Sequence, residues 1–450
     1  MARVAVAGAS GFVGRFLIEK LREKHEVYAL SRSNRVSSHP NVHWKACDFF
    51  SLKQARDALK NIDVAVYLVH SMNPSARLTQ GSFEDFDLIA ADNFARAAET
   101  HQLKQIIYLG GIINETKKLS RHLRSRQEVE EVLKSYPTPV TNLRAGLVIG
   151  PEGSSFEILE KLVKRLPMMV LPKWTKTLSQ PISVSDVVDY IDLCLLNRET
   201  FNKVFDIGGP DEVSYEDLIR KTAETYGKQP FFLRAPIASP EISKLWVRLI
   251  SGKPKEFVDP LVESLNCRMD KRDFGIEDLF QKNLISVAEA IRKARDERAP
   301  RLDVSVEVKE EVKDVRSVQR LPLPKSWSAE KLSNVYLSWL SKFLPIFLRI
   351  ESVDFRARIY LRFFDLLLLE LTRDEVYSSS DRSLLRITGG CLTQVEGLGR
   401  LEFREIRGKN LALAAIHDFR PTLPWFIYEW TQAKLHLIVM KAFSVFLSRK

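Results

Sequence analysis

The feature that most constrains the fold of this chain is a short apolar run that ends in three regularly spaced glycines. Val4 to Ala7 is an uncharged stretch of the kind found in a buried parallel strand. It is followed by Gly8, Gly11 and Gly14, and a helical pattern of apolar residues then continues to Leu21. A strand, a glycine-rich turn and a helix in this order are typical of a loop that binds the diphosphate of a dinucleotide.

Each glycine has its own role in such a loop. Gly8 permits the sharp turn, a side chain at Gly11 would block the close approach of a pyrophosphate, and Gly14 lets the helix pack on the strand. Free N–H groups and a partial positive charge at the helix start then face the phosphates. The residues expected to contact the cofactor here are those of the turn and the first helical residues: Gly8, Ser10, Gly11, Phe12, Val13 and Gly14. The alternative is a glycine-rich turn that binds nothing.

The rest of the first 150 residues alternates between strand and helix patterns. Five more strands are expected, at Glu26–Leu30, Val42–Ala46, Asp63–Val69, Gln105–Leu109 and Val140–Ile149. A helix is expected from about Ser82 to Thr100. Strands that alternate with helices predict an α/β fold with a doubly wound parallel sheet and right-handed crossovers.

The end of the second strand bears on which dinucleotide the chain binds. It reads Ala29-Leu30-Ser31-Arg32, without the Asp or Glu that NAD-binding proteins place there for the ribose hydroxyls. Arg32 can pair with a 2′-phosphate, and Ser31 can donate a hydrogen bond to it. We therefore infer NADP(H) rather than NAD(H). In the alternative interpretation, Arg32 is a solvated loop arginine.

Taken together, these motifs resemble the short-chain dehydrogenase/reductase superfamily in its extended or atypical branch, which has an NAD(P)-binding Rossmann fold. The resemblance covers roughly residues 1–295 and includes Pro181–Val188 and Val204–Leu218, which are similar to later elements of the family. It implies that Asp48, followed by Phe49, meets the adenine. His70, at the end of the fourth strand, can line the cofactor cleft, although a loop histidine is the simpler interpretation. Residues from about 151 to 295 supply the substrate lid in such proteins.

The catalytic positions depart from the family pattern. The family uses a Ser and a Tyr-x-x-x-Lys pair, whereas here the fifth strand leads to Gly110-Gly111 and the helix reads His122-x-x-x-Arg126-x-x-x-Glu130. His122 is a candidate general acid, and Arg126, one helical turn on, is a fixed positive charge that can contact the ribose. A neighbouring cation also lowers the pKa of a histidine and weakens it as an acid. The alternative is a retained fold that binds cofactor and does little or different chemistry.

A second domain is expected after a charged stretch that is poor in aromatic residues. We interpret residues 296–316 as a linker leading into a strand, and residues 317–450 as a separate α+β domain. A helix is expected at Ser328–Leu340, and the strands that follow are expected at Ser352–Leu361, Leu366–Thr372, Leu384–Thr388, Gly399–Ile406 and Leu411–His417. A long apolar helix runs from Pro424 to the end of the sequence. This order resembles the helix-grip (START-like) fold, in which a curved sheet wraps a long final helix around an apolar cavity.

Composition and charge narrow the choice of partners. The chain has 68 basic and 57 acidic residues, a net charge of +11, without a dense Lys/Arg block. We expect no nucleic-acid partner and favour an anionic cofactor or a lipid surface. The apolar stretch Leu423–Leu447 contains charged residues and predicts an amphipathic helix over a core, with contact to a membrane surface as the alternative. Four dispersed cysteines suit the reducing cytoplasm, and neither they nor the histidines have metal-ligand spacing.

Two hypotheses of function follow from the sequence. The first is an NADP(H)-dependent oxidoreductase of the atypical branch that acts on an apolar small molecule, with His122 and Arg126 at its catalytic positions. The second is a non-catalytic NADP(H) sensor or scaffold whose C-terminal domain binds a lipid or a partner.

Overall fold

The chain forms two compact units in the structure, which is a computed structural model. It describes residues 1–70, 78–113, 119–234, 248, 252, 255–265, 267–271, 275–302, 304–306, 314–353 and 355–450. Unit 1 comprises Met1–Asn73 and Ala90–Val308, and unit 2 comprises Pro74–Ile89 and Lys309–Lys450. A segment from the N-terminal third of the sequence therefore belongs to the same unit as the C-terminal residues.

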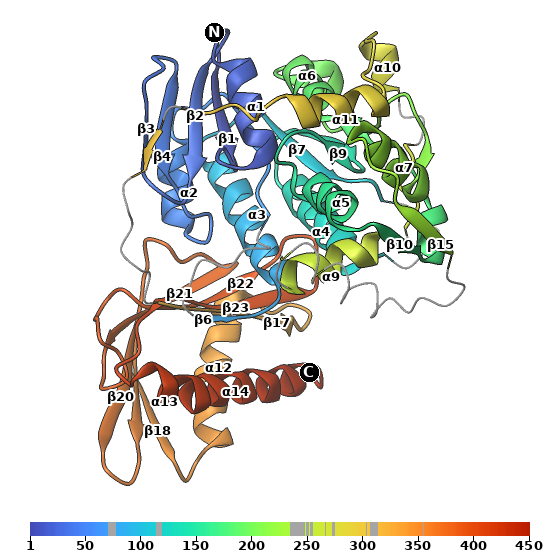
Figure 1. The fold of residues 1–450 in the computed structure, drawn as a ribbon. Coiled ribbons are helices and arrows are strands. Elements are labelled where there is room, and N and C mark those ends of the chain that lie inside the picture. The colour runs from blue at the N-terminus through green and yellow to red at the C-terminus, as the bar shows by residue number, and fades with distance from the viewer. Residues whose placement is uncertain are drawn as a thin grey trace. The chain divides into compact units, whose positions relative to one another are not determined.

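Unit 1 is built on a seven-stranded sheet with the order β13-β8-β7-β5-β1-β2-β4 (Figure 1). Its strands are β1 (Arg3–Ala7), β2 (Glu26–Ser31), β4 (Val42–Ala46), β5 (Val64–Tyr67), β7 (Gln105–Gly111), β8 (Val140–Ala145) and β13 (Val204–Ile207). Every neighbouring pair is parallel, which confirms the predicted doubly wound sheet. The chain builds outward from β1 to β2 and β4, then returns to β5 on the other side. The carboxyl ends of β1 and β5 thus mark a topological switch point, where such folds bind ligands.

Helices cover both faces of this sheet. They are α1 (Phe12–Leu21), α2 (Leu52–Leu59), α3 (Phe83–Thr100), α4 (Arg121–Lys134), α5 (Ser154–Arg165), α6 (Val184–Cys194), α7 (Tyr215–Thr225), α9 (Lys255–Ser264), α10 (Ile276–Leu279) and α11 (Val287–Asp296). On one face Val66 shares a core with α1 and α6. On the other face the adjacent residue Tyr67 packs against Phe94 of α3, with 4.7 Å between ring centroids. This alternation explains why β5 is apolar on both sides.

Short elements complete unit 1. They are β3 (Arg35–Ser37), β9 (Val148–Ile149), β10 (Met168–Leu171), β11 (Leu178–Ser179), β12 (Ile182–Ser183), β14 (Val213–Ser214), β15 (Phe231–Arg234), β16 (Val304–Val306), and the 3-10 turns η1 (Lys173–Lys176) and η2 (Arg198–Thr200). The single strand expected at Val140–Ile149 is divided into β8 and β9, because β9 leaves the main sheet to pair with β12. The sequence also predicts a helical piece at Leu245–Ile250, which, apart from Arg248, lies outside the described residues.

Unit 2 contains a mixed sheet of eight strands with the order β18-β19-β20-β21-β22-β23-β17-β6. Its strands are β6 (Leu78–Gln80), β17 (Val315–Pro322), β18 (Leu348–Val353), β19 (Arg356–Leu361), β20 (Leu366–Arg373), β21 (Arg382–Gly389), β22 (Arg400–Glu405) and β23 (Leu411–Phe419). All pairs are antiparallel except β17 with β6. The strand expected at Ser352–Leu361 is instead a hairpin of β18 and β19, and β17 begins inside the stretch interpreted as a linker.

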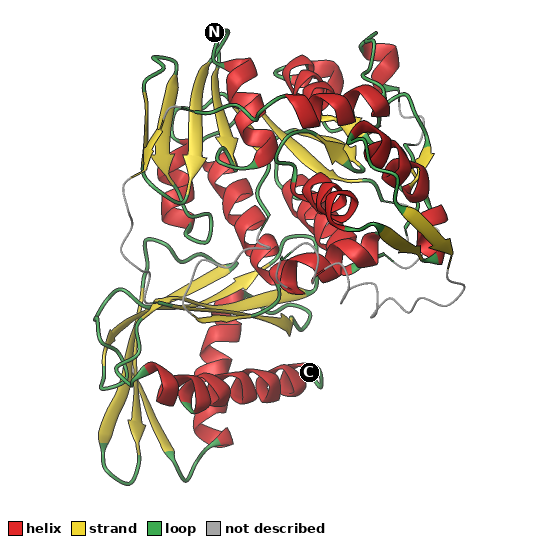
Figure 2. Cartoon of the chain, in the orientation of Figure 1, coloured by secondary structure: helices red, strands yellow, loops and turns green. Residues whose placement is uncertain are grey.

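Besides the start of α3 (residues 83–89), the helices of unit 2 are α12 (Ala329–Phe343), α13 (Trp425–Trp430) and α14 (Gln432–Leu447). The long final helix that was expected is therefore broken at Thr431 (Figure 2). Aromatic side chains fill the space between sheet and helices. The ring centroid of Tyr336 on α12 lies 5.1 Å from that of Phe403 on β22 and 5.1 Å from that of Phe443 on α14. This α+β arrangement agrees in class with the expected domain, and the helix-grip assignment stays a prediction. None of the helices in the described ranges has the length and apolar character needed to cross a membrane.

Candidate cofactor and catalytic site

The glycine turn between β1 and α1 is as tight as its sequence implies. Gly8 has a φ of +88°, and the N–H of Gly11 donates to Gly8 O at 2.9 Å. A Cβ added to Gly14 would lie 2.4 Å from Gly8 O, closer than any real contact. The N-cap of α1 is Gly11, which supplies no side-chain hydrogen bond. The start of α1 therefore presents backbone N–H groups that can bind an anion, with Ser10 and Gly11 exposed beside them.

Phe12 is fixed by a second glycine turn that the sequence interpretation missed. Its ring requires residues without a side chain at positions 150 and 153, because a Cβ on Gly150 or Gly153 would approach a ring carbon to 2.9 Å. Arg15 on the next turn of α1 pairs with Glu152 at 2.7 Å. Phe12 thus helps to anchor the start of α1, and the Gly-x-x-Gly spacing after β9 is the signal that was available.

The end of β2 lies beside this turn, since Ala9 N donates to Leu30 O at 3.3 Å. Arg32 is exposed on the loop that follows. The Ser31 hydroxyl, expected to donate to a 2′-phosphate, donates instead to Ser33 O at 2.7 Å. Arg35 lies over the ring of Trp44, 5.2 Å from its centroid. Arg32 is therefore the side chain on this loop best placed to meet an anion next to the turn.

Asp48 and Phe49 have different surroundings. Asp48 is partly exposed after β4, and its carboxylate accepts from the N–H of Phe50 at 3.1 Å. Phe49 is buried, with ring centroids 6.2 Å from Tyr67 and 5.4 Å from Phe94. Asp48 can accept a hydrogen bond from a base, whereas the side chain of Phe49 belongs to the core.

Helix α4 carries His122, Arg126 and Glu130, which keep the spacing of the catalytic helix in the resembled family. Ser120 caps its N-terminus by accepting from the N–H of Leu123 at 3.2 Å. Arg126 is buried and donates to Val69 O at 3.4 Å, at the end of β5. Because β5 borders the switch point, Arg126 brings a positive charge to the edge of the sheet where a cofactor would bind.

Glu130 completes this face of α4 and has a structural partner. It is buried and accepts two hydrogen bonds from Arg144 of β8, each 2.8 Å long, and one from Lys134 at 2.7 Å. These cations hold the pKa of the Glu130 carboxyl below its usual value. The ion pair ties α4 to β8, and neither partner was expected from the sequence.

The surroundings of His122 disfavour the general-acid role considered for it. Burial, together with the positive charges of Arg126 and His70, holds the pKa of His122 well below 6.5. Its Nδ1 is buried and has no hydrogen-bond partner among the described residues. His122 is therefore neutral at pH 7. The structure also brings His70, which is exposed, within electrostatic reach of His122 and Arg126.

The end of β7, where the resembled family leads to its serine, carries Gly110 and Gly111 in this chain. A Cβ at Gly111 would lie 3.0 Å from Leu123 Cδ2 and 3.7 Å from Arg126 Cγ. Helix α4 thus packs directly against the end of β7. Residues 71–77 and 114–118, which follow β5 and β7, lie outside the described part of the chain.

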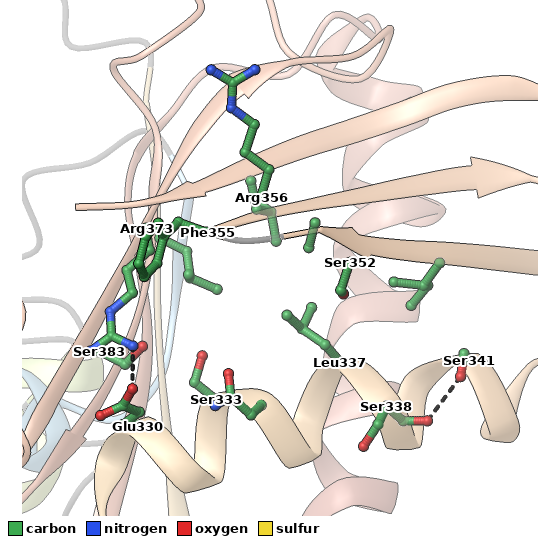
Figure 3. Close-up of a pocket in the computed structure, with 15 residues that line it drawn as sticks. Glu330, Ser333, Leu337, Ser338, Ser341, Ser352, Phe355, Arg356, Arg373 and Ser383 are labelled. Carbon is green, nitrogen blue, oxygen red and sulfur yellow. Dashed lines mark hydrogen bonds and ion pairs between the residues drawn. The ribbon is translucent and has the colours of Figure 1, made fainter. Parts of the chain in front are cut away.

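Unit 2 contains a cavity of about 540 Å³ between α12 and strands β18 to β21 (Figure 3). Hydroxyl groups dominate its polar lining: Ser333, Ser338, Ser341, Ser352 and Ser383. Arg373 pairs with Glu330 at one end, and Leu337 contributes an apolar wall. The helix-grip resemblance implied an apolar cavity around the final helix, whereas this cavity is mixed in character and lies along α12.

Comparison with known proteins defines the class of unit 1. Residues 8–162 match a family model described as NAD(P)H-binding. These residues contain the glycine turn, β2, Asp48 and α4, and they form an NAD(P)H-binding domain. The cofactor prediction is confirmed at the level of NAD(P)H.

Two curated relatives match part of the chain. The auxiliary protein GraX of Staphylococcus aureus is 34% identical over 181 residues, which is 38% of this chain and 54% of GraX. Subunit 9 of the NADH dehydrogenase (ubiquinone) 1 alpha subcomplex, a mitochondrial protein of Arabidopsis thaliana, is 26% identical over 254 residues, 52% of this chain and 62% of that subunit. The chain thus spans less than two thirds of the length of either relative.

Solved structures show the same fold for the N-terminal part. A nucleoside-diphosphate-sugar epimerase from Staphylococcus aureus aligns with a TM-score of 0.52 at 15% identity, covering 65% of this chain and 100% of the epimerase. Triphenylmethane reductase from Citrobacter sp., complexed with NADP(H), aligns with a TM-score of 0.50 at 16% identity, covering 65% and 99%. Unit 1 therefore shares the Rossmann fold of these two proteins, and the fold predicted from the sequence motifs is confirmed.

Proposed function

We propose that this chain is a cytoplasmic NADP(H)-dependent oxidoreductase whose unit 1 binds the cofactor. The observation that carries the proposal is the turn at Gly8–Gly14, where a Cβ at Gly14 would overlap Gly8 O and where α1 begins without a side-chain cap. A diphosphate needs this close approach and these N–H groups. Bound NADPH would supply a hydride to the acceptor.

Preference for NADP(H) is supported by the loop after β2. Arg32 is exposed there, and no carboxylate is present to repel a 2′-phosphate. Calorimetric titration of wild type and Arg32→Ala with NADPH and NADH tests this preference. We expect Arg32→Ala to weaken NADPH binding by roughly 10- to 100-fold, the effect of one lost charge-assisted contact, and to leave NADH binding unchanged. Arg35→Ala is the matched control, because its guanidinium lies over Trp44. Equal NADPH affinity in wild type and Arg32→Ala would exclude this role.

The kind of acceptor follows from the groups near the end of β5. Arg126 is a buried, permanent positive charge that stabilises negative charge developing on an acceptor oxygen. His122 is neutral at pH 7 and holds no proton that it can readily release. An aldehyde would leave a strongly basic alkoxide that needs a proton at once. A quinone or an extended enone leaves a weakly basic, delocalised anion that can take its proton from water. We therefore place quinones and enones ahead of aldehydes as substrates.

Oxidation of NADPH against a panel of quinones, enones and aldehydes tests this proposal, with Arg126→Gln and His122→Phe as variants. Turnover of quinones that falls with Arg126→Gln and survives in His122→Phe supports it. Turnover of aldehydes that is lost in His122→Phe would contradict it, because it would make His122 the proton donor.

The alternative function is a sensor or scaffold that binds NADP(H) without turnover. The glycine at position 111 and the neutral state of His122 favour it, since both working groups of the resembled family are replaced. In this alternative, unit 2 is a helix-grip domain that binds a lipid or partner, and its hydroxyl-lined cavity is the candidate site. Tight NADPH binding with no turnover of any acceptor in the panel would favour the alternative.

A further inference from the structure

Unit 2 exposes a group of large apolar side chains where α12 leads into β18 and where β19 turns into β20. We call it the aromatic tip, and it consists of Phe343, Ile346, Phe347, Phe363, Phe364 and Leu366. Phe363 and Phe364 are 67% and 78% exposed at the β19–β20 turn. Arg362 N donates to Phe347 O at 2.8 Å, which holds the two loops together. An apolar cluster this exposed marks an interaction surface.

The outward side of α13 and α14 is also apolar. We call it the outer helix face, and it consists of Phe426, Trp430, Leu435, Leu437, Ile438 and Val445. The inward residues Val439, Met440 and Phe443 of α14 are buried in the core of unit 2. Helix α14 is therefore apolar on both sides, although its outward side has no protein covering it among the described residues. A helix of this kind needs a second apolar environment.

Ring contacts connect the aromatic tip to α14. Phe343 stacks on Trp339 with 4.6 Å between centroids, and Trp339 lies 6.0 Å from Phe446 of α14. The aromatic tip therefore adjoins α14 within unit 2, where α12 and α14 cross on the same side of the sheet (Figure 1).

Most charges around this surface are positive, although Glu429 is exposed on α13 between Phe426 and Trp430. From Gln432 to Lys450 the sequence has four basic residues and no acidic residue. Lys434, Ile438 and Lys441 follow one another along one side of α14, because helical residues four and three positions apart share a face. Lys434 lies over the ring of Trp430, 3.5 Å from its centroid. At the tip, the acidic Asp365 is paired with Arg349. The apolar surface is thus bordered mainly by cations.

We propose that the aromatic tip and the outer helix face dock unit 2 on the surface of an anionic phospholipid membrane. Phenylalanines at exposed turns reach the acyl boundary, tryptophan is suited to the headgroup level, and lysines extend to lipid phosphates. The charge distribution favours lipid over a second copy of this chain. A two-fold contact through the same surface would bring the lysines of one copy against those of the other.

Sedimentation of the full chain with sucrose-loaded vesicles tests the proposal. We expect the protein to sediment with vesicles of phosphatidylglycerol and phosphatidylcholine, to stay in the supernatant with phosphatidylcholine alone, and to be released by high salt. Lys434→Gln/Lys441→Gln should weaken partitioning by about thirty-fold, since each lysine near an anionic surface contributes roughly fivefold. Phe363→Ser/Phe364→Ser should also weaken it, through lost apolar burial.

Matched controls come from residues of unit 2 outside this surface. Val376→Ser removes an apolar side chain that is 81% exposed on the β20–β21 connection, and Lys325→Gln/Lys409→Gln removes two cations elsewhere. Both should bind vesicles like wild type. Absence of wild-type sedimentation, or equal losses in the controls, would overturn the proposal. Ultracentrifugation without lipid tests whether a second copy of the chain covers this surface instead. A dimer that becomes a monomer in Phe363→Ser/Phe364→Ser would assign the surface to a second copy.

Discussion

At the scale of single residues, the site depends on two kinds of position. At the first kind a glycine is needed because there is no room for a side chain, and at the second kind the surroundings shift the pKa of a side chain. Gly14 is the clearest case of the first kind. In an ordinary helix alanine is more favourable than glycine by roughly 1 kcal/mol, so glycine at the third position of α1 must have another cause. That cause is Gly8 O, which occupies the space of a Cβ.

Gly14→Ala should therefore destabilise unit 1 and weaken NADPH binding together. We expect a loss of about 2 kcal/mol in the free energy of unfolding, the usual effect of overpacking, and at least a tenfold loss of cofactor affinity. Urea denaturation and calorimetry measure the two effects. Gly389→Ala is a suitable control, because its Cβ would find only ordinary contacts beyond 3.7 Å. A Gly14→Ala protein that is more stable than wild type would contradict the steric argument.

His122 is a residue whose charge state can be measured. Its pKa is held below 6.5 by burial and by the charge of Arg126, so Arg126→Gln should raise it. NMR titration of the imidazole protons reports this pKa directly. As the pH falls, the unfolded chain binds a proton on this histidine at a higher pH than the folded protein does. The free energy of unfolding should therefore fall as the pH drops below 6.5. His122→Phe should remove that part of the pH dependence, and an unchanged pH profile would contradict it.

At the scale of elements, local patterns in the sequence predicted the strands and turns whose formation depends on residues close together in the chain. Short apolar runs and glycine spacing predicted the turn at Gly8 and six strands of the main sheet of unit 1, and the structure confirms them. Contacts between distant elements were not predictable in this way. The contact of Phe12 with Gly150 joins residues of α1 and the β9–α5 connection, and no local pattern in a single sequence encodes it. Likewise, hydropathy alone did not indicate that the final helix breaks at Thr431.

The ion pair between α4 and β8 gives a test at this scale. Glu130→Ala should lower the free energy of unfolding by about 3 kcal/mol, because it leaves Arg144 largely buried without its bidentate partner. Lys134→Ala, which removes a more exposed partner of the same carboxylate, should cost below about 1 kcal/mol. The lowered pKa of Glu130 also predicts how stability depends on pH. The contribution of the ionised carboxylate to the free energy of unfolding is present above pH 4.5 and is lost as the pH falls below that value. Chemical denaturation at several pH values measures all three.

At the scale of the whole molecule, the two units do not follow one another simply along the chain. Strand β6 comes from the N-terminal third of the sequence and pairs with β17. Gln80 Nε2 donates to Ala433 O at 3.0 Å, and Asp85 pairs with Arg320. The three residues of β6 are too few to give a strand pattern, so the sequence did not indicate that they belong to unit 2.

A fragment of residues 309–450 should therefore be less stable than the same fragment with residues 74–89 attached by a flexible linker. We expect a difference of about 2 kcal/mol in the free energy of unfolding, from the lost edge strand and its hydrogen bonds. The urea midpoint of each fragment measures it. A control linker fragment carrying Thr79→Pro should lose the benefit, since proline in the middle of a three-residue strand disfavours pairing with β17. Identical midpoints for all three fragments would contradict the role of β6.

The placement of β6 also orders the events of synthesis. A ribosome releases Gln80 long before Gln319, whose side chain bonds to it from 239 positions away. Strand β6 therefore stays unpaired in the nascent chain while most of unit 1 is synthesised. Since such distant pairings form slowly, the sheet of unit 2 is expected to be completed after the sheet of unit 1.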